Sequence, residues 1–151
     1  MATDVNQYLG NPNLKKANVP VEFTKEQIQE YQKCMDDPVY FIQEYMKIVS
    51  LDEGLVPFKM YDFQRNMVKT FHDNRFTICK LPRQSGKSTT IIAYLLHYVL
   101  FNQNVNVAIL ANKSSTARDI LGRLQLGYEN LPKWLQQGVI SWNKGSLDLE
   151  N

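Results

Sequence analysis

The segment LPRQSGKST, residues 81–89, constrains the fold of this chain more than any other feature. It follows an apolar, β-prone run at residues 75–81 and precedes an apolar stretch that predicts a helix over residues 88–101. A tight turn between a strand and a helix N-terminus gathers backbone N–H groups where they can hold phosphate oxygens. We therefore interpret the segment as a phosphate-binding loop; the alternative is a chance Gly-Lys-Ser at a helix start.

The residue types in this loop suit a triphosphate and its magnesium ion. Gly86 permits close approach of the backbone, Lys87 can reach the β- and γ-phosphates, and Ser88 can offer its hydroxyl to Mg²⁺. The usual pattern G-x-x-x-x-G-K-[ST] is broken at its first position, which holds Leu81. The candidate nucleotide-binding residues of the loop are Pro82, Arg83, Gln84, Ser85, Gly86, Lys87, Ser88 and Thr89.

Composition limits the class of protein without selecting one. At 151 residues the chain is one domain or part of one, and its net charge of +2 is too small to indicate nucleic-acid binding. Cys34 and Cys79 are far apart, which indicates neither zinc nor a disulfide framework. The N-terminus has no signal-peptide pattern, and the apolar run at residues 91–101 is too short to span a bilayer. A cytoplasmic protein without a membrane partner is therefore expected.

Start signals and turn residues divide the chain. Thr24 with Gln27 is a capping-box pattern, and Asp37 followed by Pro38 is a second helix start. The three predicted regions are a flexible N-terminal arm at 1–23, a helical lid-like subdomain at 24–59, and an ATPase portion at 60–151.

Within the last region, helices and strands are predicted to alternate. The pattern gives a helix over 62–72, strands over 75–81 and 105–111, a helix over 113–130, and a hairpin of 139–142 with 147–151. Alternation around a phosphate loop predicts an α/β fold, with a parallel sheet covered by helices on both faces.

The segment MYDFQRNM, residues 60–67, supplies a candidate base-binding site about twenty residues before Lys87. The amide of Gln64 can pair with the N6 and N7 edge of adenine, while Tyr61 or Phe63 can stack on the base. The alternative for Gln64 is a solvated helix residue.

Several separate segments, taken in order, resemble one family. YDFQR, LPRQSGKSTT, VAILANKSSTARDIL and LPKWLQQGVISWNKGSLDLEN are similar to the large terminase of T-even-like tailed bacteriophages, the ATP-driven motor that packages DNA. The resemblance implies a P-loop NTPase of the additional-strand, conserved-glutamate type that uses ATP and Mg²⁺. It also implies that Arg83 acts in cis on the γ-phosphate beside the catalytic Lys87. Implied partners are double-stranded DNA, the portal protein and the small terminase subunit, met in the host cytoplasm at the procapsid portal vertex.

One part of the family pattern is missing from these 151 residues. No run of four apolar residues is followed by Asp-Glu, and neither Asp119, Asp148 nor Glu150 fits that role. We therefore expect the N-terminal portion of an ATPase domain that is inactive alone and needs the missing C-terminal part of the large terminase as a partner. The sheet would also lack the acidic strand beside the loop strand, so we expect the side chains of Phe76, Ile78 and Ile109 to be exposed. The isolated chain is then expected to self-associate or aggregate.

Two other functions stay open at this point. A helicase-like or translocase-like P-loop ATPase would share Gln64 and the loop. A nucleotide-binding or assembly fragment without activity of its own would explain the absence of the acid pair.

Overall fold

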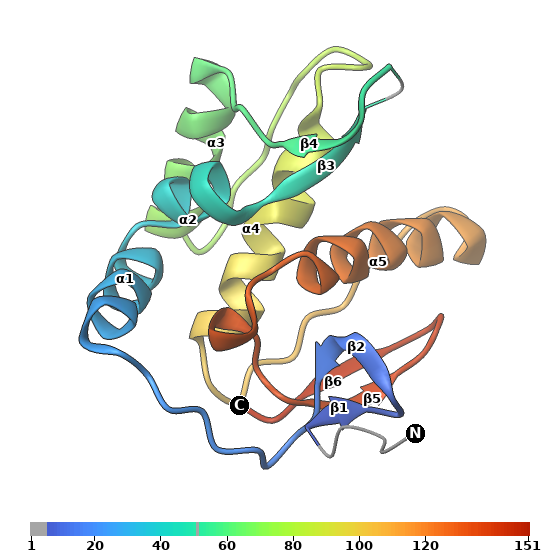
Figure 1. Ribbon diagram of the computed structural model, residues 1–151. Coiled ribbons are helices and arrows are strands. Elements are labelled where there is room, and N and C mark those ends of the chain that lie inside the picture. The colour runs from blue at the N-terminus through green and yellow to red at the C-terminus, as the bar shows by residue number, and fades with distance from the viewer. Residues whose placement is uncertain (1–5, 51) are drawn as a thin grey trace.

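The computed structural model describes residues 6–50 and 52–151. The described residues form short strands and five α-helices around one apolar core (Figure 1). In chain order the elements are β1 (Gln7–Tyr8), β2 (Asn11–Lys15), α1 (Lys25–Asp36), α2 (Pro38–Tyr45), β3 (Lys47–Ser50), β4 (Gly54–Pro57), α3 (Asp62–Asp73), α4 (Lys87–Phe101), α5 (Ser114–Glu129), the 3₁₀ turn η1 (Lys133–Leu135), β5 (Val139–Trp142) and β6 (Leu147–Leu149).

The helix starts follow the predicted capping signals. The Thr24 hydroxyl accepts a hydrogen bond from the Gln27 N–H at 3.2 Å, and the Gln27 side chain accepts one from the Thr24 N–H at 3.0 Å. Asp37 accepts bonds from the backbone N–H groups of Val39 and Tyr40, with Pro38 at the first helical position of α2. Both predicted starts are confirmed, because the side chains satisfy N–H groups that have no partner inside the helix.

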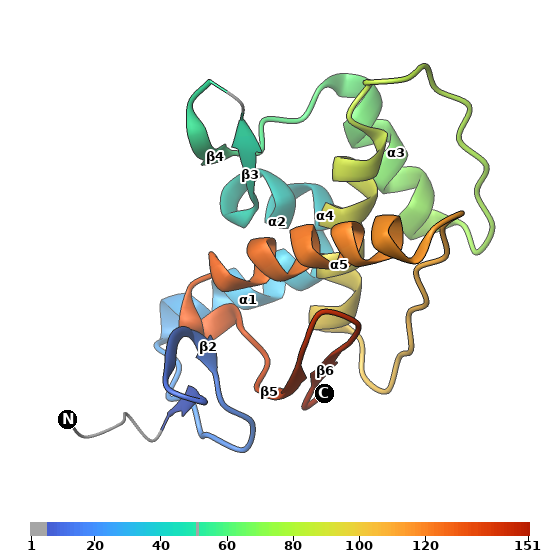
Figure 2. The same cartoon turned by 90° about the vertical axis from the view of Figure 1, so that its right-hand side faces the viewer.

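Helix α4 is the centre of the core. Figures 1 and 2 show it between α1, α2 and α3 on one side and α5 on the other. A helix that is apolar around most of its circumference is stable when buried, and α4 has this composition. Its fully or almost fully buried apolar side chains are Ile92, Ala93, Leu96 and Leu100. They share one cluster with side chains from α1, α2, α3 and α5, so the predicted helical lid-like subdomain packs on α4; its boundaries stay a prediction.

The predicted parallel sheet is wrong. Within residues 6–50 and 52–151 the strands form three antiparallel pairs, β1 with β2, β3 with β4, and β5 with β6, together with one parallel bridge between Lys16 and Val139. Residues 75–81 and 105–111 form no strand, and Figure 2 shows the two connections that contain them looping away from the helices. The additional-strand, conserved-glutamate type of P-loop NTPase fold is therefore not the fold observed.

The physical reason lies in what a buried parallel strand requires. Such a strand needs neighbouring strands to hydrogen-bond with and helices on both faces of the sheet. The sequence of the strand shows that its own side chains are apolar, but it does not show whether those partners are present. Without partners among the described residues, Phe76 is 84% exposed, Ile78 is 98% exposed and Leu110 is 91% exposed. The predicted exposure of Phe76 and Ile78 is confirmed, but Ile109 is half-buried.

The N-terminal arm, which was predicted to be flexible, contains two short strands within its described residues. Residues 1–5 lie outside the described residues, and β1 and β2 form a hairpin whose Leu14 is 2% exposed in the core. Lys16 and Ala17 pair with Val139 of β5, which places the arm beside the C-terminal hairpin.

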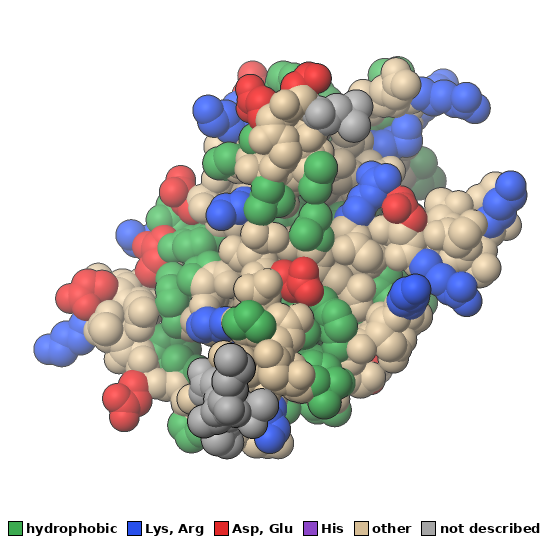
Figure 3. Space-filling view, turned by 45° about the vertical axis from the view of Figure 1, so that its right-hand side comes forward, with side chains coloured by type: hydrophobic (Ala, Val, Ile, Leu, Met, Phe, Trp, Pro, Cys, Tyr) green, Lys and Arg blue, Asp and Glu red, His purple; other side chains and the backbone are tan. Residues whose placement is uncertain are grey.

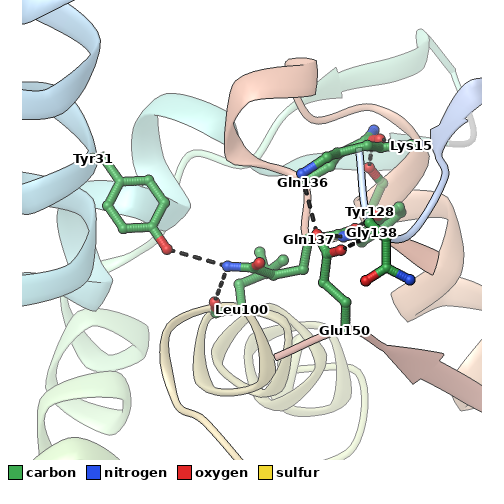
Figure 4. Close-up of polar contacts among 9 residues, drawn as sticks. Lys15, Tyr31, Leu100, Tyr128, Gln136, Gln137, Gly138 and Glu150 are labelled. Carbon is green, nitrogen blue, oxygen red and sulfur yellow. Dashed lines mark hydrogen bonds and ion pairs between the residues drawn. The ribbon is translucent and has the colours of Figure 1, made fainter. Parts of the chain in front are cut away.

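Two polar side chains, the buried Gln136 and the partly buried Glu150, attach the arm to the rest of the molecule (Figure 4). The Gln136 side chain accepts from the Lys15 N–H at 3.0 Å and donates to three backbone carbonyls, those of Asn13, Tyr128 and Leu131. The Glu150 carboxylate accepts from Lys15 Nζ at 3.2 Å and from the N–H groups of Asn18 and Gly138 at 2.7 and 2.6 Å. Glu150 is therefore a structural residue of this fold.

The same network extends to α1 and α4. Gln137 donates to the Tyr31 hydroxyl at 3.2 Å and to the Leu100 carbonyl at 3.0 Å. Partial burial would raise the pKa of Glu150, but the hydrogen bonds from Asn18, Gly138 and Lys15 outweigh it and lower that pKa. The carboxylate is accordingly charged at neutral pH.

None of the helices in the described part of the chain has the length and apolar character needed to cross a membrane.

Candidate nucleotide-binding site

The predicted phosphate-binding loop forms a tight turn directly before α4. Gln84 and Gly86 adopt left-handed backbone conformations, with φ of 59° and 73°. The Ser85 hydroxyl and Lys87 Nζ both donate to the Pro82 carbonyl, at 3.0 and 3.2 Å. These two bonds close the loop on itself. The Lys87 ammonium could leave the Pro82 carbonyl oxygen and bind a phosphate oxygen in its place.

The start of α4 is fixed by a residue that sequence reasoning missed. Thr90 is fully buried, and both its N–H and its hydroxyl donate to the Gly86 carbonyl at 3.0 Å. A hydroxyl four residues after a helix N-cap commonly bonds back in this way, and that spacing was the signal in the sequence. The bonds hold Gly86 at the helix end that favours anions.

The loop is open to solvent and positively charged. Pro82, Arg83, Gln84 and Ser88 are exposed, whereas Ser85, Gly86, Lys87 and Thr89 are half-buried. Among the described residues no ion pair engages Arg83 or Lys87. Figure 3 shows one face of the molecule with Lys and Arg side chains along its right-hand edge and few acidic side chains beside them. The charge of the loop is thus available to an anionic ligand.

The candidate base-binding residues lie at the start of α3. Tyr61 is 70% exposed and Phe63 is 39% exposed, and their rings are stacked with centroids 5.9 Å apart and planes 10° apart. Gln64 is instead 3% exposed, and its Oε1 accepts a hydrogen bond from the Tyr61 N–H at 2.9 Å. The alternative of a solvated Gln64 is excluded by this burial.

The structure brings the two candidate segments together at one point. A Cβ atom added to Gly86 would lie 2.6 Å from Gln64 Nε2, so the Gln64 amide lies directly against the end of the phosphate loop. Only glycine fits there without displacing Gln64, and only glycine tolerates this φ at little cost. The proximity of residues 61–64 to the loop is observed; their binding roles stay predictions.

The residues fit a phosphate with magnesium better than a magnesium ion alone. Ser88 supplies an exposed hydroxyl in the first turn of α4. The described residues contain no group of three His, Cys, Asp or Glu side chains that could hold a metal ion. Magnesium usually keeps several waters and binds through phosphate oxygens, so one hydroxyl beside a polyphosphate is a suitable donor set.

The acidic side chains considered earlier have other surroundings. Asp119 pairs with Arg123 on α5 at 2.9 Å, Asp148 is exposed on β6, and Glu150 holds the arm. None of the three side chains forms a hydrogen bond or an ion pair with a described residue of the loop.

A hollow in the described part of the chain lies away from the loop. It has a volume of about 810 Å³ and is lined by residues 104–109, by α5 and by residues 145–149 and 151, together with Val99. No residue of the loop contributes to it. The hollow is also lined by a helix start, at Ser114, and by a glycine, Gly145, but a Gly-Lys-Ser sequence at the start of a helix is found in the loop and not in the hollow. The loop therefore stays the candidate nucleotide site.

Comparison with known families identifies the class of protein. Residues 78–151 match the family model described as terminase large subunit, T4-like-virus type, N-terminal. Over these residues the chain belongs to that family, which agrees with the resemblance to the large terminase of T-even-like bacteriophages seen in the sequence. The matched segment contains the loop, α4, α5 and the C-terminal hairpin, whereas Tyr61, Phe63 and Gln64 precede it.

Proposed function

We propose that residues 82–89 bind the triphosphate of ATP with Mg²⁺, and that this chain is the ATP-binding part of the motor that packages double-stranded DNA into the procapsid. The observation that carries the proposal is Gly86, a left-handed glycine held at the N-terminus of a long helix beside Lys87. The family membership of the segment supports the same function.

The roles of the side chains follow from their positions. Lys87 would leave the Pro82 carbonyl and pair with the β- and γ-phosphates, while the helix end and the loop N–H groups hold the remaining oxygens. Ser88 would hold Mg²⁺, which when bound neutralises phosphate charge. Arg83 would approach the γ-phosphate, and the exposed rings of Tyr61 and Phe63 would contact the base.

Hydrolysis needs more than these residues. Phosphoryl transfer depends on groups that hold Mg²⁺ and orient the attacking water, and no candidate acid lies at the loop. We therefore assign ATP binding to these 151 residues and turnover to a large subunit in which an acid pair is present. Its partners would be DNA, the portal protein and the small terminase subunit, at the procapsid portal vertex in the host cytoplasm.

Replacement of Gly86 tests the proposed site. Gly86→Ala should weaken MgATP binding by at least about tenfold, because the Cβ meets Gln64 and left-handed alanine is strained by roughly 1–2 kcal/mol. Isothermal titration of MgATP into wild type and variant measures the change, and circular dichroism checks the helix content.

The chain offers a matched control for backbone strain. Gly54 has the same φ of 73°, but a Cβ there would meet nothing within 4 Å. Gly54→Ala should share the strain and keep wild-type affinity for MgATP. Equal affinity in Gly86→Ala and wild type would rule out the loop as the triphosphate site.

A further inference from the structure

The small net charge of the chain conceals a separation of positive and negative charge. Residues 59–123 contain ten Lys and Arg but three Asp and Glu, a formal charge of +7. Residues 19–58 contain three Lys and eight Asp and Glu, a formal charge of −5. Figure 2 shows α3, the connections that precede α4 and α5, and the start of α5 on the right-hand side, with α1 and the β3–β4 pair on the left. The fold therefore gives the molecule a basic side and an acidic side.

Most of the cations on the basic side have no acidic partner. Among the described residues, ion pairs engage Arg65 and Arg123 but none of the other eight cations in residues 59–123. Outside the phosphate loop, Lys80, Lys113 and Arg118 are all exposed. Their charge is not neutralised within the described part of the chain, so it can attract a polyanion.

The residues around Lys113 are of the kind that contact phosphates. Asn112, Ser114, Ser115 and Thr116 flank this lysine, and all four are exposed. Lys and Arg together with Ser, Thr and Asn supply many of the hydrogen bonds that proteins make to the phosphates and sugars of DNA. Such contacts position a duplex without reading its bases. The composition of this segment thus favours a nucleic-acid backbone as the ligand.

The acidic side of a second copy is the other anionic surface that could pair with the basic side. Several of its carboxylates already serve the fold. Glu30 accepts hydrogen bonds from the Tyr40 and Tyr45 hydroxyls at 2.6 and 2.9 Å, and Asp37 accepts from backbone N–H groups at the start of α2. A DNA duplex instead presents a continuous row of phosphates, about one charge for every 1.7 Å of its axis. Cations spread over several elements match the duplex better.

We propose that the side of the molecule that bears Lys80, Lys113 and Arg118 contacts the phosphate backbone of duplex DNA without reading its sequence. The inference rests on the proposed function for its partner, DNA, but it concerns residues outside the ATP loop at 82–89. Like charges repel, so the acidic side faces away from the duplex, and the separation of charge also orients the molecule on DNA.

Fluorescence anisotropy of a labelled duplex, titrated with the 151-residue chain without nucleotide, tests this surface. Wild type should bind with a dissociation constant on the order of micromolar at about 50 mM salt, and binding should weaken as salt rises toward about 200 mM. The double variant Lys113→Gln with Arg118→Gln should bind at least about tenfold more weakly. Its plot of log affinity against log salt should be shallower by about two, because each phosphate contact contributes about 0.9 to that slope. Lys80→Gln should lower the slope by about one.

The acidic side provides a control with the same change in net charge. Lys25 and Lys47 are exposed, and neither takes part in an ion pair among the described residues. Lys25→Gln with Lys47→Gln should therefore keep the wild-type affinity and salt slope. A second duplex of equal length and unrelated sequence should bind as tightly as the first. Thermal unfolding of each variant checks that the fold is retained.

Each other result would overturn the proposal. These results are no binding of duplex by wild type, binding that does not depend on salt, preference for one duplex sequence, or an equal loss in the Lys25 and Lys47 variant. If the Lys113 and Arg118 variant binds DNA normally but no longer self-associates in sedimentation, the surface takes a second copy and not DNA.

Titration of MgATP into the same proteins separates this proposal from the proposed function. The Lys113 and Arg118 variant should keep wild-type affinity for MgATP, because both residues lie outside the loop; a matching loss of MgATP affinity would make its DNA defect a general structural effect and overturn the surface. A wild-type chain that binds duplex DNA as expected but does not bind MgATP would remove the nucleotide site and leave the DNA surface standing.

Discussion

An Arg83→Ala variant of a complete, ATP-hydrolysing large subunit is expected to turn over ATP roughly 10³-fold more slowly, with little change in ATP affinity. Arg83 is exposed on the loop beside the left-handed Gln84, and no ion pair among the described residues holds it elsewhere. A guanidinium in that position can stabilise charge that develops on the transferred phosphoryl group, which lowers the barrier without tightening the ground state. Steady-state kcat and KM, with a direct binding measurement, give the two effects separately.

A nearby arginine provides the control for Arg83. Arg75 is also exposed, and its guanidinium lies 5.3 Å from the Phe76 ring centroid, before the loop. Arg75→Ala should leave kcat unchanged. Proportional losses of affinity and turnover in Arg83→Ala would make Arg83 a ground-state phosphate clamp, and unchanged turnover would remove it from the chemistry.

Acid is expected to destabilise the fold by about 3 kcal/mol through His97 as the pH falls from about 6.5 to about 4. The ring is 2% exposed, Nε2 bonds to the Cys34 carbonyl at 2.8 Å, and Phe41 and Phe101 pack against it. This burial lowers the pKa of His97 to about 4, although the bond to Cys34 opposes the change. As the pH falls, His97 therefore takes up a proton in the unfolded chain before it does so in the folded chain. The free energy of unfolding that His97 contributes above its unfolded pKa is lost as the pH falls toward 4.

Urea unfolding at pH 7.5 and pH 4.5 measures this loss. His97→Gln retains an amide donor for the Cys34 carbonyl but does not titrate, so it should be less stable at pH 7.5 and lose less stability on acidification. His72, which lies on α3 with its ring centroid 6.2 Å from that of His97, is exposed, and its charge lowers the pKa of His97 less than burial does. His72→Gln should therefore keep most of the wild-type pH dependence. If His97→Gln and wild type lost the same free energy of unfolding on acidification, the acid sensitivity could not be assigned to His97.

Local signals in the sequence predicted local structure. Thr24 with Gln27, and Asp37 with Pro38, marked helix starts because the bonds involved join residues at most three apart. The turn at residues 143–145 was predicted for the same reason, since Asn143 bonds the N–H groups of Gly145 and Ser146 at 2.8 Å. The hairpin around it is confirmed as β5 and β6.

Long-range structure was not accessible in this way. Apolar runs at 75–81 and 105–111 predicted strands, but pairing depends on partners that the runs themselves do not encode. The arm was predicted to be flexible because residues 1–23 contain Asn, Gln, Pro and Lys without periodicity. Its strands are held by contacts with Gln136 and Glu150, which lie more than a hundred residues away along the chain.

The sequence predicted which segments make up the candidate site, but it did not predict the side-chain contacts between them. The sequence placed Gln64 and the loop in one site, and the structure puts the Gln64 amide against Gly86. Motif spacing could not show that the Gln64 oxygen is engaged by Tyr61, or that Lys87 bonds the Pro82 carbonyl. Those details depend on side-chain conformations, which the order of residues leaves open.

The most direct test of the account is an amide chemical-shift map of the ¹⁵N-labelled chain titrated with MgATP. We predict shifts concentrated at Gln84–Thr89 and Tyr61–Gln64, which are absent when Lys87→Ala is titrated in the same way. Shifts confined to the hollow lined by residues 104–109 and 145–149, or shifts at the loop that survive Lys87→Ala, would contradict the assignment of ATP binding to this loop.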